Sequence, residues 1–261
     1  MLCLKMTIAT IRGRIPSSGG IIDKYKYFKL EVEAVGRIRW LGHAAFQITT
    51  NEGKQIYIDP WLEGNPAYPL KGEELEEADL VLVTHDHFDH LGDAVRLLQG
   101  AKARAVGQPE LLGVLEVEGV PGEKLLGMNT GGTVEVAGIA VTMTQAFHSS
   151  SKGSPVGFIL HLPAGPVIYH AGDTGLFGDM KLFAELYNID VALLPIGGVY
   201  TMDPLQAATA VKLLSPRVVI PMHYRTFPAL AQDAKRFARL VQEKAPRVEV
   251  VVLEPGGQWE F

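Results

Sequence analysis

A cluster of metal-binding residue types follows an apolar stretch of the chain. Residues 80–83 are Leu-Val-Leu-Val, and the next residues place His85, His87, Asp89 and His90 within six positions. A protein core rejects unpaired polar groups, and a solvated face gives no reason to concentrate histidines directly after a buried strand. Imidazole nitrogens and carboxylate oxygens are ligands of Zn²⁺, Mn²⁺ and Fe²⁺. The spacing therefore predicts a metal site rather than a group of surface histidines.

Three further potential ligands also stand just past the end of an apolar stretch. They are His148, Asp173 and His223. In α/β folds, sites assemble at the carboxyl ends of strands. Taken alone, a histidine at such a place is more often a satisfied or surface residue. Beside the cluster at 85–90, we expect all three residues to join the metal site.

The elements that must position these residues alternate between strands and helices. Expected strands cover 37–41, 45–50, 55–58, 80–84, 103–107, 133–137, 139–146, 157–162, 167–170, 190–195, 218–221 and 248–253, and expected helices cover 90–98, 205–214 and 231–244. The stretches 78–84 and 189–195 look alike, and each precedes a helix, which suggests two related halves. The pattern predicts an α/β fold in which two sheets are covered by helices on their outer faces.

Composition and charge limit the classes of function. The chain has 261 residues, of which 47% are hydrophobic and 20% charged, as in an ordinary globular protein. The net charge of −5 argues against a nucleic-acid partner. Cys3 is the single cysteine, which excludes a disulfide within the chain and fits a reducing cytoplasm. No apolar stretch reaches the ~20 residues that span a membrane. Residues 1–36 lack a clear period and are interpreted as an N-terminal extension before a domain at 37–261, with a translated segment upstream of the natural start as the equal alternative.

With these residues in view, the chain resembles the metallo-β-lactamase-fold hydrolases. The seven potential ligands match the motif of that family in order, and the resemblance covers about residues 37–255. Further stretches are similar to one branch of metal-dependent hydrolases, related to L-ascorbate-6-phosphate lactonase; they are 40–43, 58–60, 146–150, 170–175 and 221–224. The resemblance implies a four-layer αββα sandwich of two related halves.

The resemblance also implies roles for the ligands. One ion would be held by His85, His87 and His148, a second by Asp89, His90 and His223, and Asp173 would bridge the two. The implied cofactors are two divalent ions, zinc or manganese, with iron ranked behind both. Histidine and aspartate ligands suit zinc and manganese alike, so the choice stays open. The second site has no cysteine, which argues against a β-lactamase of the commonest zinc type.

The leading functional hypothesis is a cytoplasmic hydrolase of small anionic esters or lactones, in which a metal-bound hydroxide attacks and Asp89 holds or accepts a proton. The positive charge of two divalent ions is larger than the negative charge of Asp89, Asp173 and a bridging hydroxide together. The remaining local charge of about +1 favours an anionic substrate. His43 is a second catalytic candidate. The sequence leaves open whether it contacts the substrate, supports a metal ligand or is a plain turn residue. Asp59 is a candidate for orienting a ligand histidine, with a simple turn-forming aspartate as the equal alternative.

Two alternatives and two minor candidates remain at this point. A phosphodiesterase or nuclease of the same fold is an alternative enzyme, against which the net charge of −5 speaks. A metal-binding or redox sensor protein without turnover is an alternative of another class. Tyr224 and Arg225 adjoin His223 and are candidates for substrate contact. A homo-oligomer is left open.

Overall fold

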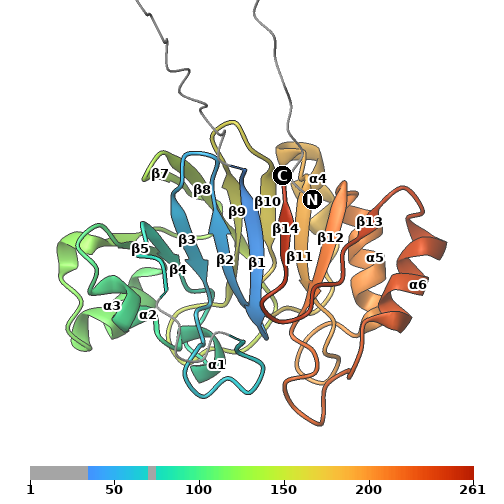
Figure 1. The fold of residues 1–261 in the computed structure, drawn as a ribbon, viewed down its shortest axis with the longest axis horizontal. Helices are drawn as coiled ribbons and strands as arrows, with labels where there is room; N and C mark the ends of the chain where they lie inside the picture. The colour runs from blue at the N-terminus through green and yellow to red at the C-terminus, as the bar shows by residue number, and fades with distance from the viewer. Residues whose placement is uncertain (1–34, 70–74) are drawn as a thin grey trace, which may run out of the picture. The chain divides into compact units, whose positions relative to one another are not determined.

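A computed structural model describes residues 35–69 and 75–261 of the chain. Apart from residues 35 and 36, the predicted N-terminal extension lies outside the described residues. The described part contains two seven-stranded sheets, which Figure 1 shows with their helices. The predicted α/β fold with two sheets is confirmed.

The first sheet comes mainly from the first half of the domain. Its strands, in spatial order, are β14 (Gln258–Glu260), β1 (Arg37–Gly42), β2 (Ala45–Thr49), β3 (Gln55–Ile58), β4 (Leu80–Leu82), β5 (Arg104–Gly107) and β6 (Leu125–Gly127). The pairs from β3 to β6 are parallel, whereas β14, β1, β2 and β3 pair antiparallel. The carboxyl ends of β3 and β4 therefore lie at the same edge of this sheet.

The second sheet repeats this arrangement with the later strands. Its order is β13 (Glu249–Val250), β12 (Val218–Met222), β11 (Val191–Pro195), β10 (Val167–His170), β9 (Val156–His161), β8 (Ile139–Gln145) and β7 (Thr133–Val136). The strands from β10 to β13 pair in parallel, and those from β7 to β10 pair antiparallel. Each sheet thus has one parallel and one antiparallel part.

Alternation of side chains along the strands produces two cores. Ile56 and Ile58 of β3 join a cluster that includes the residues of the second sheet, whereas Tyr57 between them joins a cluster with Leu98 and Leu111. Successive side chains of a strand point to opposite faces, so the first sheet is buried on both sides. One face packs against the second sheet, and the other packs against helices.

The helices complete the outer layers. They are α1 (Phe88–Leu91), α2 (Ala94–Leu98), α3 (Pro109–Val117), α4 (Met180–Tyr187), α5 (Pro204–Leu214) and α6 (Lys235–Lys244). The cluster on the outer face of the first sheet contains residues of α2 and α3, and the cluster that includes the second sheet contains residues of α4, α5 and α6. The order of layers is that of the αββα sandwich, as the resemblance implied. Within the described ranges, no helix combines the length and apolar character that crossing a bilayer requires.

One predicted helix is interrupted where it matters for the site. The sequence predicted a single helix over 90–98, but the structure has α1 and α2, separated at Gly92, which has a φ of 40°. A side chain at Gly92 would collide with the backbone of Pro60 and Trp61, so this close approach needs glycine. The break lets α1 carry Asp89 and His90 independently of the direction of α2.

Candidate metal centre

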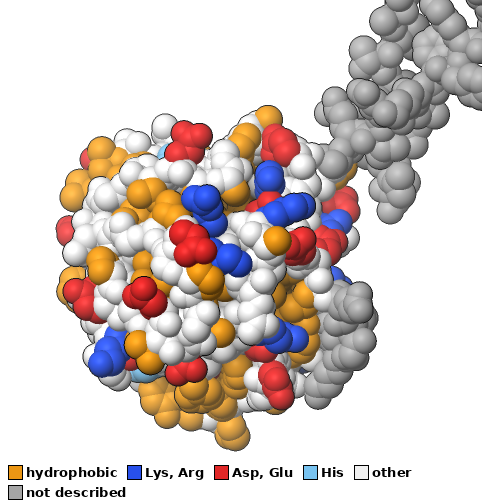
Figure 2. Space-filling view, turned by 90° about the vertical axis from the view of Figure 1, so that its left-hand side faces the viewer, with side chains coloured by type: hydrophobic (Ala, Val, Ile, Leu, Met, Phe, Trp, Pro, Cys, Tyr) orange, Lys and Arg blue, Asp and Glu red, His pale blue; other side chains and the backbone are white. Residues whose placement is uncertain are grey.

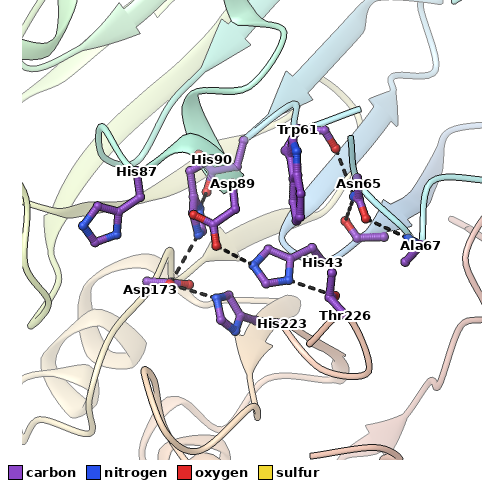
Figure 3. A network of polar contacts seen from close by, with 12 residues as sticks. His43, Trp61, Asn65, Ala67, His87, Asp89, His90, Asp173, His223 and Thr226 are labelled. Carbon is purple, nitrogen blue, oxygen red and sulfur yellow. Dashed lines mark hydrogen bonds and ion pairs between the residues drawn. The ribbon is translucent and has the colours of Figure 1, made fainter. Parts of the chain in front are cut away.

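The predicted ligands meet at the edge of the two sheets where the parallel strands end. The segment after β4 carries His85, His87, Asp89 and His90, and the last two of these belong to α1. The other three come from the segments that follow β8, β10 and β12: they are His148, Asp173 and His223. Figure 3 shows His90 of α1 and His223 after β12 pointing toward Asp173 after β10. The structure therefore brings together all seven residues that the sequence singled out.

One group of ligand atoms comes from His85, His87 and His148, whose ligand atoms lie within 4.8 Å of one another. His85 Nε2 and His87 Nδ1 are 2.9 Å apart. Burial and, to a smaller extent, the nearby His90 together lower the pKa of His85 to about 2. His85 is therefore a neutral imidazole at physiological pH, and this is the form that binds metal.

A second group lies beside the first. Its members are Asp89, His90, His223 and additionally His43, again with ligand atoms within 4.8 Å of one another. Burial alone would lower the pKa of His90, but the carboxylates of Asp173 and Asp59 raise it well above its usual value. The buried anions around His90 thus favour a positive charge at this place.

Asp173 forms a third group of potential ligands with His85 of the first group and His90 of the second. Its Oδ2 atom lies 3.0 Å from His223 Nε2, 3.3 Å from His90 Nε2 and 3.6 Å from His148 Nε2. His148 belongs to the first group, and the other two histidines belong to the second. Burial would raise the pKa of Asp173, but His223 and His90 hold it well below its usual value. An ionised Asp173 therefore contacts both groups of potential ligands.

The unsatisfied atoms of the cluster fit divalent cations. Asp173 Oδ1 is buried and has no hydrogen-bond partner among the described residues, and His90 Nε2 has only the 3.3 Å contact with Asp173 Oδ2. A buried polar atom without a partner is costly, and the cost is higher for an ionised carboxylate. A cation between these atoms would satisfy both of them. The donor set of nitrogen and oxygen without sulfur suits zinc, manganese or iron, so the residues present fit the implied metal.

Asp59 and Thr84 fix the orientation of two histidines. Asp59 Oδ2 accepts hydrogen bonds from His90 Nδ1 at 2.7 Å and from Thr84 Oγ1 at 2.8 Å. The Thr84 hydroxyl has a single proton, so its oxygen accepts from His85 Nδ1, 3.0 Å away. Both rings consequently present Nε2 to the cluster. The predicted contact of Asp59 with a histidine is confirmed, and Thr84 is a supporting residue that the sequence argument missed.

His43 contacts Asp89 and not solvent. Its Nε2 lies 3.1 Å from Asp89 Oδ2, and its Nδ1 lies 2.9 Å from Thr226 Oγ1. Burial lowers the pKa of His43 to about 4, so the ring is neutral and carries one proton. A carboxylate only accepts, so this proton is on Nε2, and Nδ1 accepts from the Thr226 hydroxyl. His43 therefore holds the carboxylate of Asp89 in place, and its predicted part in catalysis stays a prediction.

Strained backbone accompanies these contacts. His43, Asp59 and His223 have φ values of 57°, 47° and 56°, in the left-handed region that favours glycine. Residues other than glycine persist there only where the surrounding structure holds them, and such positions gather at functional sites. In this chain each of the three directs its side chain into the cluster or to one of its histidines.

Asp86 positions the loop that carries His148. Its Oδ1 atom accepts hydrogen bonds from Ser150 Oγ at 2.8 Å and from the Ser151 amide at 2.9 Å. The sequence alone does not show this role of Asp86, because the two serines lie more than 60 positions away. Its hydrogen bonds hold the loop after β8 beside the segment after β4, so that His148 reaches the other two histidines of its group.

The two minor candidates, Tyr224 and Arg225, make contacts with residues outside the cluster. Tyr224 is buried and stacks on Trp40, with ring centroids 5.1 Å apart. Burial raises the pKa of its hydroxyl to about 12. Arg225 is paired through Nη1 with Glu254 Oε2 at 2.7 Å. The suggestion that Tyr224 contacts substrate is therefore wrong, because the side chain belongs to the core.

Comparison with known proteins agrees with this geometry. Residues 37–223 match the model of the beta-lactamase superfamily domain. A relative from Caldivirga maquilingensis named UPF0173 metal-dependent hydrolase is 52% identical over 224 residues, which are 85% of this chain and 96% of the relative. A relative of the same name from Herpetosiphon aurantiacus is 45% identical over 234 residues, 86% of this chain and 97% of the relative.

A solved structure is similar as well. Igni18, described as a novel metallo hydrolase from the hyperthermophilic archaeon Ignicoccus hospitalis, has 41% sequence identity and a TM-score of 0.77. The match covers 87% of this chain and 98% of that one. Since the matches extend over nearly the whole of these proteins, the chain belongs to the UPF0173 metal-dependent hydrolases of the beta-lactamase superfamily.

Proposed function

We propose that this chain hydrolyses small esters or lactones that carry an anionic group, at a site that holds two divalent metal ions. The observation that carries the proposal is the position of Asp173, whose Oδ2 lies within 3.6 Å of histidines from both groups of ligand atoms. A carboxylate shared in this way suits two neighbouring ions. Ions bound here would supply a water of lowered pKa and would polarise the carbonyl or phosphoryl oxygen of the substrate.

The residues around the ligands have separable tasks. Burial would raise the pKa of Asp89, but the hydrogen bond from His43 and the nearby His90 lower it, so the carboxylate is ionised at neutral pH. An ionised Asp89 can hold an ion or accept a proton at the edge of the cluster, where its side chain is 14% exposed. His43 keeps the carboxylate in one orientation. Asp59 and Thr84 do the same for His90 and His85.

Three arguments support the finer parts of the proposal. The excess positive charge of two ions over their carboxylate ligands favours an anionic substrate. The motifs similar to the lactonase branch favour a lactone or related ester. The nitrogen and oxygen donors favour zinc or manganese. The single cysteine supports a reducing compartment such as the cytoplasm, which stays a prediction.

The test begins with metal loading. Protein purified in the presence of zinc or manganese is assayed against phosphorylated and carboxylated lactones and esters, neutral analogues of the same substrates, phosphodiesters and a long RNA. We expect the anionic lactones or esters to be cleaved best. The matched variants are His85→Ala, which removes a ligand, and His161→Ala, which removes a histidine at the end of β9 outside the cluster. Cleavage of the RNA alone would replace the proposal with a nuclease, and equal activity of the two variants would exclude this cluster.

A further inference from the structure

Large hydrophobic side chains are exposed on two of the segments that carry the ligands and on the loop after β11. Phe88, between His87 and Asp89, is 69% exposed, and Phe147, next to His148, is 62% exposed. Val199 and Tyr200, in the loop after β11, are 65% and 58% exposed. Figure 2 shows hydrophobic side chains gathered at the lower end of the molecule, the end at which α1 lies in Figure 1. Exposed apolar side chains that cluster beside a site mark a binding surface.

The first part of this surface is an aromatic wall that continues into the cluster. The Trp61 ring lies 5.5 Å from the Phe88 ring and 5.3 Å from the His43 ring, edge to face in both cases. Phe227 stacks on Trp61 at 5.8 Å and also lies 5.5 Å from His43. The exposed Phe88 is thus connected through the buried Trp61 ring to His43, the residue that holds Asp89.

The second part lies on the side of His148 and Asp173. Phe147 packs against Phe177 at 5.1 Å, and its backbone amide donates to Thr174 Oγ1 at 2.9 Å. The loop with Val199 and Tyr200 is held to the same place, because the amide of Met202 donates to the carbonyl of Thr174 at 3.0 Å. Thr174 follows Asp173 directly. Both exposed segments are therefore anchored next to the shared carboxylate.

The arginine beside His223 is already paired with a carboxylate. Arg225, two residues past His223, directs Nη1 to Glu254 and is neutralised there. Phe88, Phe147, Val199 and Tyr200, here called the apolar rim, instead leave hydrophobic area in contact with water. Covering such area releases free energy in proportion to the area covered. A ligand that reaches the ions and also has an apolar part would gain affinity from both.

We infer that the apolar rim binds an alkyl or aromatic part of the substrate while the bond to be cleaved lies at the metal cluster. The substrate class is then an amphiphilic ester or lactone, with its anionic group toward the ions and its apolar group toward Phe88 and Phe147. This inference rests on the proposed function for the placing of the bond, but binding at the rim is measurable without turnover.

The test uses alkyl phosphonates as probes of the metal-loaded protein. Methyl-, butyl- and hexylphosphonate share one anionic head and differ only in the length of the chain. Calorimetric titration should give an affinity that rises about two- to fourfold per added methylene, the upper value corresponding to full burial. Phe88→Ser and Phe147→Ser, each checked for metal content, should reduce this gain per methylene at least twofold. Leu186→Ser is the matched control, since Leu186 is exposed to 67% on α4 and lies outside the rim.

Each outcome decides the inference. A gain with chain length that the two phenylalanine variants reduce, and that Leu186→Ser retains, supports it even if no ester or lactone is turned over. Equal affinity for the three phosphonates would overturn it while leaving the proposed hydrolysis intact. Sedimentation with phospholipid vesicles separates a membrane surface from a substrate site. Binding to vesicles that needs Phe88 and Phe147, together with equal affinity for the phosphonates, would assign the rim to a membrane instead.

Discussion

Replacing Asp59 by asparagine tests how the fold orients the metal ligands. Asp59 is fully buried and accepts three hydrogen bonds, two from Thr84 and one from His90 Nδ1. Asparagine keeps the shape but offers one oxygen and one amide group. With its oxygen toward His90, the amide group faces the Thr84 backbone amide, so that two donors meet and one bond is lost.

The structure sets the size of the effect. Loss of one hydrogen bond to a charged acceptor, with a buried donor left unsatisfied, costs about 1.5–3 kcal/mol in the free energy of unfolding. For a domain of this size that lowers the Tm by about 3–10 °C. The His90 ring also loses its anionic partner, and changes of this kind weaken metal binding by about 10- to 100-fold.

The assay compares Asp59→Asn with Asp79→Asn. Asp59 directly follows β3 and accepts hydrogen bonds from Thr84 beyond the end of β4, whereas Asp79 precedes β4 and accepts hydrogen bonds from the Gln55 amide and Lys54 Nζ. Thermal melts of the metal-free proteins should show a loss of stability in both variants. Metal affinity, measured by competition with a chelating dye, should fall only in Asp59→Asn. Equal metal affinities of Asp59→Asn and the wild type would refute the claim that Asp59 orients a ligand.

Three further predictions concern charge and metal. Asp173→Asn should lose bound metal and hydrolytic activity while its circular dichroism spectrum stays that of the wild type, since the change keeps the shape; full activity would make Asp173 a plain loop residue. In the metal-free folded protein, the pKa of His43 is lowered to about 4 and that of His85 to about 2. As the pH falls below 6.5, these two histidines therefore take up protons in the unfolded chain before they do so in the folded one. Denaturant titrations should therefore show stability falling between pH 6 and pH 4 by up to about 1.4 kcal/mol per unit for each histidine, and a flat profile would show that both rings titrate normally. Removal of metal with EDTA should lower the Tm of the loaded protein. If the free ion was present at about a thousand times its Kd, the loss corresponds to about 4 kcal/mol in the free energy of unfolding. An unchanged Tm would exclude tight binding.

Most of the strands could be predicted from the sequence because their side chains have a clear pattern. The continuous apolar runs that became β4, β11 and β12 are buried on both faces, as expected for strands covered by helices. Short elements were missed. β14 has only three residues and is defined by its pairing with β1, far away in the chain. The helix α3 was missed although Pro109 begins it, a common first residue of a helix.

The ligands of the candidate site could be predicted, whereas their supports could not. Histidines and aspartates just after apolar strands are visible in a sequence, since the residue types carry the chemistry. Thr84 and Asp86 stand in the same segment, but their roles depend on Asp59 and Ser150, which lie 25 and 64 positions away. The apolar rim was also invisible, because Phe88 and Phe147 look like core residues until the fold leaves them exposed.

The number of metal ions per chain tests the central claim most directly. Elemental analysis of protein purified with excess metal and then freed of unbound ions should give two zinc or manganese ions per chain, in accord with two groups of ligand atoms that meet at Asp173. His161→Ala should give the same value. One ion or fewer per chain in metal-replete wild-type protein would contradict the account of a shared Asp173.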